Sequence, residues 1–274
     1  AEAPPGALFS NFRKLVVTGE AKPQDIAFYF VHWFADLAGA EPYPPEGCEK
    51  FVLKFPLKVL KQFVQSFSIV QTLGEAPETE VYENYLVWRW TNHDPPLGDV
   101  PTSSAIAKLR LVIMAQGDSL NLLKAFHELD GSDRLVLETE LAIPGCVGQH
   151  YARETQPEDA RGPAILVYYG PALLQRVGKQ NPHVALKVLA EVFRQARVLW
   201  PFSQSAAGEF VIVRIDTLKE QDVHVLSQTD SDHIWVLGKT SDHDGAVRHV
   251  AISEMASIQW RTHKPLTFAS TRRA

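Results

Sequence analysis

Cysteine is scarce in this chain, with only Cys48 and Cys146 among 274 residues. Two cysteines are too few for a disulfide framework, and a chain of this length buries enough apolar surface to fold without one. The scarcity excludes the small disulfide-rich secreted folds and favours a reducing compartment. We therefore expect the protein to be cytoplasmic.

Long apolar runs are also missing. No stretch of about 18 uncharged apolar residues occurs, which is the length that a membrane-spanning helix needs. Residues 1–6 lack the basic start and the apolar stretch of a secretory signal. The sequence therefore predicts no membrane insertion, and because the chain begins with Ala rather than Met, we expect it to be part of a larger protein or assembly.

An excess of basic charge is absent as well. The chain has 27 Lys plus Arg against 32 Asp plus Glu, which gives a formal net charge of −5. Nucleic-acid-binding domains usually present a basic face, so the sequence predicts no nucleic-acid partner. The Gly-rich phosphate loop, the dinucleotide fingerprint and the Gly-x-Ser-x-Gly elbow are missing too. We therefore expect no cofactor.

What the chain does contain is helical periodicity over its first two hundred residues. Residues 23–37 are apolar on all sides, so we expect that helix to be buried nearly all round, at the centre of the first domain. Elsewhere the apolar residues recur every three or four positions, which is typical of amphipathic helices. The predicted helices span 8–17, 23–37, 56–67, 78–90, 106–114, 119–130, 132–143, 171–177 and 182–199.

The period changes to that of strands after residue 208. Five short strands are predicted over 209–216, 223–226, 234–237, 247–252 and 258–260, separated by Asp, Ser and Gly clusters. A small antiparallel barrel would hide the edges of so short a sheet. The fold prediction is therefore α+β: a mainly helical domain over 6–203, then a five-stranded antiparallel β-barrel over 208–264, with the short 253–257 link typical of SH3-like barrels.

His93 and Asp94 form the most suggestive pair for chemistry. A histidine beside a carboxylate can hold a divalent metal when other helices supply more ligands. Two prolines follow at once and place the pair in a loop, and the distant ligand would have to be His32 or His127. We interpret the pair as a polar turn that ends a helix, and a metal-dependent hydrolase as the alternative.

Two further groups carry reactive side chains. Cys146 precedes His150 by four residues, and a thiolate near an imidazole is the beginning of a cysteine nucleophile, although an idle thiol is the simpler interpretation. Two Asp and His clusters in the last quarter, at 232–233 and 242–244, could meet at a zinc ion, but their spacing matches no established ligand pattern. Five of the ten histidines lie in this part: His224, His233, His243, His249 and His263.

The aromatic residues allow two interpretations. Most stand on apolar stripes and are expected in the core, whereas a shared aromatic pocket would make the protein a carrier of a small ligand. They are Trp33, Phe34, Trp88, Trp90, Tyr168, Tyr169, Trp200 and Phe202. Trp90 and the loop over 41–47 are the ones expected to reach the surface.

The proline-rich loop is the predicted docking site. Its prolines restrict the backbone, so less conformational entropy is lost when a partner orders the loop. We expect Tyr43 to anchor the contact, with Pro44, Pro45 and Trp90 beside it. The sequence thus favours a non-catalytic module that binds a protein or peptide, with a metal-dependent or cysteine-based hydrolase and a small-ligand carrier as alternatives.

Overall fold

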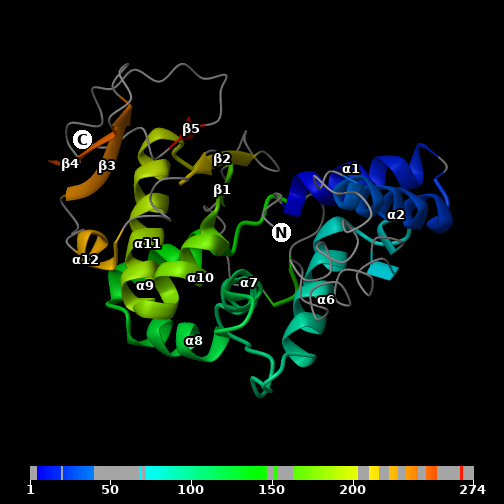
Figure 1. Cartoon of the computed structure of the whole chain (residues 1–274). Helices are drawn as coiled ribbons and strands as arrows, with labels where there is room; N and C mark the ends of the chain where they lie inside the picture. Colours follow the sequence, from blue (N-terminus) through cyan, green and yellow to red (C-terminus); the bar gives the residue numbers. More distant parts are fainter. Residues whose placement is uncertain are drawn as a thin grey trace.

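The fold was analysed in a computed structural model of the chain (Figure 1). The structure describes residues 5–19, 21–39, 68–69, 72–146, 151–153, 163–202, 210–215, 222–227, 233–239, 245–251 and 266–267. This part of the chain is mostly helical, as the sequence predicts for residues up to about 200.

The first helices form one end of the molecule, at the right of Figure 1. Helix α1 (Pro5–Val17) and helix α2 (Pro23–Gly39) are called the N-terminal arm below. Helix α1 packs on the short 3₁₀ helix η1 (Thr72–Gly74) and on α6 (Glu78–Thr91). Arg13 Nη1 donates to the carbonyl of Ala76 at 2.8 Å, which fixes α1 to the start of α6.

The other end is a packed group of helices around α11 (Pro182–Leu199), which contacts α8, α9, α10 and strand β1 (Ala164–Tyr168). We call it the α7–α11 body. Its remaining helices are α7 (Ala105–Ala115), α8 (Ser119–Glu128), α9 (Gly131–Leu141) and α10 (Gly170–Gln180). Phe126 of α8 and Phe193 of α11 are fully buried in its core.

Capping residues explain where two of these helices begin. The Asp130 carboxylate accepts hydrogen bonds from the backbone N–H groups of Ser132 and Asp133, at 2.9 and 3.0 Å, at the start of α9. The Asn181 side chain accepts from Val184 N at the start of α11, and Pro182 occupies the first turn, where its missing N–H costs nothing.

Three strands form a parallel sheet in the order β1, β2 (Phe210–Arg214), β5 (Leu266–Thr267). Parallel neighbours need a crossover connection, and α10 and α11 provide it between β1 and β2. The chain leaves β1 through Tyr169, whose φ of 70° is left-handed. At Gly170 an added Cβ would lie 3.1 Å from Met114 Cε, so glycine permits the close approach of this turn to α7.

The predicted five-stranded antiparallel barrel is wrong. Strand β2, its expected first strand, pairs in parallel with β1, which lies in the helical region, and residues 223–226 form a helix, α12 (Val223–Leu226). Strands β3 (His233–Lys239) and β4 (Gly245–Ala251) form a separate antiparallel pair, and residues 258–260 lie outside the described part. The near-continuous apolar sequences of β1 and β2 are typical of buried parallel strands, and that signal distinguishes them from an alternating barrel strand.

The expected burial of helix α2 on all sides is also wrong. Ile26 is buried, but Phe28, Tyr29 and Val31 are among the most exposed large apolar residues of the described part. The predicted helix over 56–67 lies wholly outside the described residues. The predicted boundary between the two domains, over residues 203–208, lies outside the described residues and stays a prediction. Within the described ranges, every helix is too short or too polar to cross a membrane.

Candidate functional site

His93 lies in a turn after α6, as the sequence predicts, and both of its ring nitrogens are engaged. Nδ1 lies 2.7 Å from the carbonyl oxygen of Pro95, and Nε2 lies 2.8 Å from Ser119 Oγ. Because a carbonyl only accepts, Nδ1 carries the proton, and Nε2 of the neutral ring accepts from the Ser119 hydroxyl. A metal would have to displace this serine to reach the remaining lone pair of His93.

The same contact has the geometry of a nucleophile and its base. Ser119 could give its proton to His93 Nε2, while the Pro95 carbonyl orients the ring. Ser119, however, is 1 % exposed, and its hydroxyl is engaged by the half-buried His93. A substrate carbonyl has no approach to Oγ in this arrangement. The pair therefore joins the loop after α6 to the start of α8.

Within the described part of the chain, no further ligands lie near His93 and Asp94 to support the metal alternative. His32 and His127, the predicted partners of His93 and Asp94, are both exposed side chains on α2 and α8. Among the described residues, no group of three or more His, Cys, Asp or Glu side chains is placed to share an ion. The proposed His93 and Asp94 centre therefore has no complete ligand set in this part of the chain.

Trp90 is not the surface aromatic that the sequence predicts. Its side chain is 6 % exposed, and its indole Nε1 donates to the carbonyl of Gly98 at 3.1 Å. The loop after α6 folds back over the Trp90 ring instead of leaving it open. The prolines of this loop gave no indication in the sequence that it covers the ring. Tyr43, Pro44 and Pro45 lie outside the described residues, so their predicted role in docking stays a prediction.

Cys146 lies in an apolar setting that suppresses its reactivity. Burial raises the pKa of the Cys146 thiol to about 12, with nearby Glu78 adding to the rise. The thiol is therefore protonated at neutral pH, whereas the thiolate is the nucleophile. The Tyr151 hydroxyl faces the thiol but is buried without a hydrogen bond of good geometry. His150, the predicted base, lies outside the described residues.

The sequence analysis did not predict the buried ion pairs between α9 and α11. Arg197 contacts the Glu140 carboxylate through Nε at 2.9 Å and Nη2 at 2.5 Å. Arg194 reaches Asp133 at 2.6 Å and also binds Glu191. Two helices that each carry charges on an otherwise apolar face are a signal for such pairs. Within the described chain these charges satisfy one another, so they hold the helices together.

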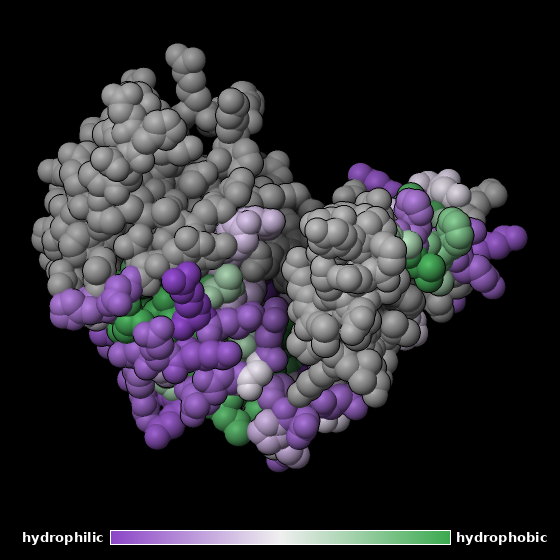
Figure 2. Space-filling model, in the orientation of Figure 1, coloured by the Kyte–Doolittle hydropathy of each residue, from purple (hydrophilic) through white to green (hydrophobic). Residues whose placement is uncertain are grey.

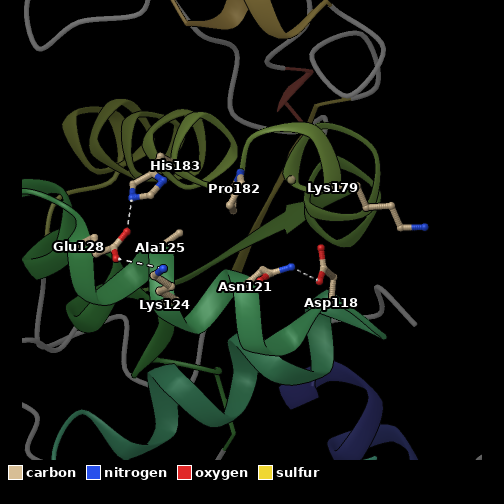
Figure 3. Close-up of a pocket in the computed structure, with 9 residues that line it drawn as sticks. Asp118, Asn121, Lys124, Ala125, Glu128, Lys179, Pro182 and His183 are labelled. Atoms are coloured by element: carbon tan, nitrogen blue, oxygen red, sulfur yellow. Dashed lines mark hydrogen bonds and ion pairs between the residues drawn. The ribbon is translucent and has the colours of Figure 1, made fainter. Parts of the chain in front are cut away.

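The described surface contains a polar hollow of about 210 Å³ between α8 and the α10–α11 turn (Figure 3). Its described lining residues are Asp118, Asn121, Lys124, Ala125, Glu128, Gly178, Lys179, Pro182 and His183. Glu128 lies 3.2 Å from His183 Nε2 and 3.9 Å from Lys124 Nζ. No aromatic side chain is among these residues, so the hollow is not the aromatic pocket that a small-ligand carrier would need.

An exposed apolar strip follows α2 in the N-terminal arm. Phe28, Val31 and Ala35 are three and four residues apart, which places them on one helix face, and the exposed Tyr29 lies about 100° around the helix from Phe28. Phe28 is 73 %, Val31 62 % and Tyr29 57 % exposed. Figure 2 shows hydrophobic residues in green, among purple hydrophilic ones, at the end of the molecule that α1 and α2 form. We call these four residues the α2 strip.

The C-terminal histidines are placed only in part. His224 lies on α12, where its backbone N–H donates to Asp222 Oδ1 at 2.7 Å. His233 belongs to β3 and His249 to β4, and the register pairs them with different partners, Ala251 and Trp235. His243 and His263 lie outside the described residues, so zinc binding by these clusters, which the sequence did not favour, stays an alternative from the sequence alone.

Comparison of the chain with protein-family models, with curated proteins and with solved structures gives no match. The function of this chain is therefore inferred from the residues described above.

Proposed function

We propose that this chain is a non-catalytic module that recognises a protein or peptide partner through the α2 strip. The observation that carries the proposal is the joint exposure of Phe28 and Val31 on the face of α2 opposite to the buried Ile26, with Tyr29 also exposed on the same helix. Single exposed apolar residues are ordinary, but a contiguous group marks a contact surface. The predicted loop contacts at Tyr43, Pro44 and Pro45 remain part of the proposal on sequence grounds.

The state of the two candidate nucleophiles supports binding over catalysis. Ser119 has the base it needs but lacks access for a substrate, and the Cys146 thiol is protonated at neutral pH because burial raises its pKa. Each group would need a rearrangement before it could attack a carbonyl. A hydrolase is therefore the second choice, and membership of a larger protein or assembly agrees with a module whose main feature is a contact surface.

The proposal is tested by selecting peptides from a random display library against the whole wild-type chain. The selected peptides are then measured against the double variant Phe28→Ser with Val31→Ser. We expect apolar peptides whose affinity falls about tenfold or more in this variant, because truncating central apolar contacts of an interface costs more than 1 kcal/mol.

A matched control is available on the α7–α11 body. Leu135 on α9 and Val198 on α11 are also exposed apolar residues, and Leu135→Ser with Val198→Ser alters the surface to a similar degree. We expect this variant to bind the selected peptides as the wild type does. The proposal is wrong if the library yields no enriched peptide, or if both double variants bind equally well. Circular dichroism of each variant verifies that the fold is retained.

A further inference from the structure

Asp118 is the unusual residue of the hollow beside α8. It occupies the N-cap of that helix, where an aspartate normally accepts backbone N–H groups of the first turn. Its carboxylate does not cap the helix and accepts from Asn121 Nδ2 at 2.9 Å instead. Because that partner is neutral, no cation of the described chain is paired with Asp118.

The opposite end of the hollow is balanced. Glu128 lies between Lys124 and His183, and Figure 3 shows both side chains turned toward its carboxylate. Lys179, the remaining cation of the lining, points away from the hollow in the same view. Among the described lining residues, no cationic side chain is paired with Asp118, whose charge is offset only by the N-terminal dipole of α8, and the Glu128 end offers both donors and acceptors without a large net charge.

The floor between the two ends is apolar. Ala125 and Gly178 are buried residues of the lining, and Pro182 lies across the hollow from α8 (Figure 3). A surface of this kind suits methylene groups, and ligand sites commonly join an apolar lining to a few polar groups that fix orientation. The hollow thus has a negatively charged end, an apolar floor and a polar far end. This arrangement fits a short linear molecule.

We propose that this hollow binds a linear aliphatic primary amine. Its ammonium group lies between the Asp118 carboxylate and the Asn121 amide oxygen, and its methylene chain lies on Ala125, Gly178 and Pro182. The far end meets Glu128 if it is a second amine, and Lys124 if it is a carboxylate. The ammonium is the chemistry shared by the two, and the inference does not depend on the function proposed for the α2 strip.

The test follows backbone amide resonances of the ¹⁵N-labelled whole chain, at residues such as Asn121, Ala125 and Lys179. Three probes of equal chain length are titrated: 1,6-diaminohexane, 6-aminohexanoate and 1,6-hexanediol. We expect saturable shifts with at least one of the two amines and none with the diol. The tighter amine identifies the group at the far end.

The decisive variant is Asp118→Asn. The Asp118 carboxylate makes no cap hydrogen bond, and asparagine has the same shape and can still accept from Asn121 Nδ2, so the fold is retained while the charge is lost. We expect the affinity for the amine to fall about tenfold or more, the size of a charge-assisted hydrogen bond. Asp99→Asn, at an exposed carboxylate in the loop after α6, should leave the affinity unchanged. The inference is overturned if neither amine gives saturable shifts, if the diol binds equally well, or if Asp118→Asn binds like the wild type.

Discussion

The α7–α11 body and the N-terminal arm are both helical, but the body buries its apolar side chains, whereas the arm leaves several of them exposed. Helix α11 buries its apolar face between four neighbouring elements, and Val188, Leu189 and Phe193 are almost inaccessible. Helix α2 is at least as apolar in sequence and leaves Phe28 and Val31 largely exposed. The comparison teaches that the packing neighbours of a helix, more than its own composition, decide how much of it is buried.

The largest change in stability is expected from a large truncation in the core of the α7–α11 body. Phe193→Ala should lower the free energy of unfolding by about 3–5 kcal/mol, because the ring is fully buried and the surrounding side chains cannot collapse into the space. Urea denaturation followed by circular dichroism measures the change. A loss below about 1 kcal/mol would mean that the body is as loosely packed as the exposed face of α2.

A second prediction concerns the ion pair that joins α9 to α11. Glu140→Leu should lower the free energy of unfolding by about 3 kcal/mol, because it leaves the Arg197 guanidinium without a counterion in a buried setting. The double variant Glu140→Leu with Arg197→Met should recover about 1 kcal/mol or more of that loss, since no unpaired charge remains. If the double variant is less stable than the single one, the unpaired charge is not the cause.

The third prediction addresses the start of α9. Asp130→Ala should cost about 1 kcal/mol because it removes the cap, whereas Asp130→Asn retains it. The backbone N–H of Asp133, together with Ser132, lowers the pKa of Asp130 to about 2 from an ordinary 3.8. The stability from this charge is thus present above pH about 4 and is lost as the pH falls toward 2. Denaturation at pH 6 and pH 2 should show a smaller pH effect for Asp130→Asn than for the wild type, and an equal effect contradicts the assignment.

The smallest effect is expected in the arm. Phe28→Ser should change the free energy of unfolding by less than about 0.5 kcal/mol, as is usual for exposed positions away from the core. Thermal melting beside Phe193→Ala gives the comparison directly. A loss of several kcal/mol would show that Phe28 is buried in solution, and the α2 strip would then not be a surface.

Local patterns predict the helices of this protein well. Pro182 marks the start of α11 because proline geometry acts within a few residues, whereas α9 is capped by Asp130, a residue that the sequence pattern placed at the end of the preceding helix. Local patterns do not predict the parallel pairing of β1 with β2, because β1 precedes α10 and α11 in the sequence and β2 follows them. An antiparallel barrel was expected because it needs only neighbouring strands.

The candidate sites were harder to predict than the helices. His93 stands in a turn as expected, but its contact with Ser119 depends on how α6 and α8 meet. Trp90 is buried by a loop whose prolines indicated exposure. The hollow beside α8 depends on how α8 packs beside the α10–α11 turn, and this tertiary packing has no signature in the sequence.

The register that pairs Ala164 with Phe210 has a consequence during synthesis of the chain. Strand β1 leaves the ribosome before α10 and α11 exist, and its partner β2 follows only after both helices. For that interval a strongly apolar strand has an unpaired edge, which is the kind of segment that neighbouring chains can join. The crossover that builds the sheet therefore also sets a period in which the nascent chain depends on dilution or on a chaperone.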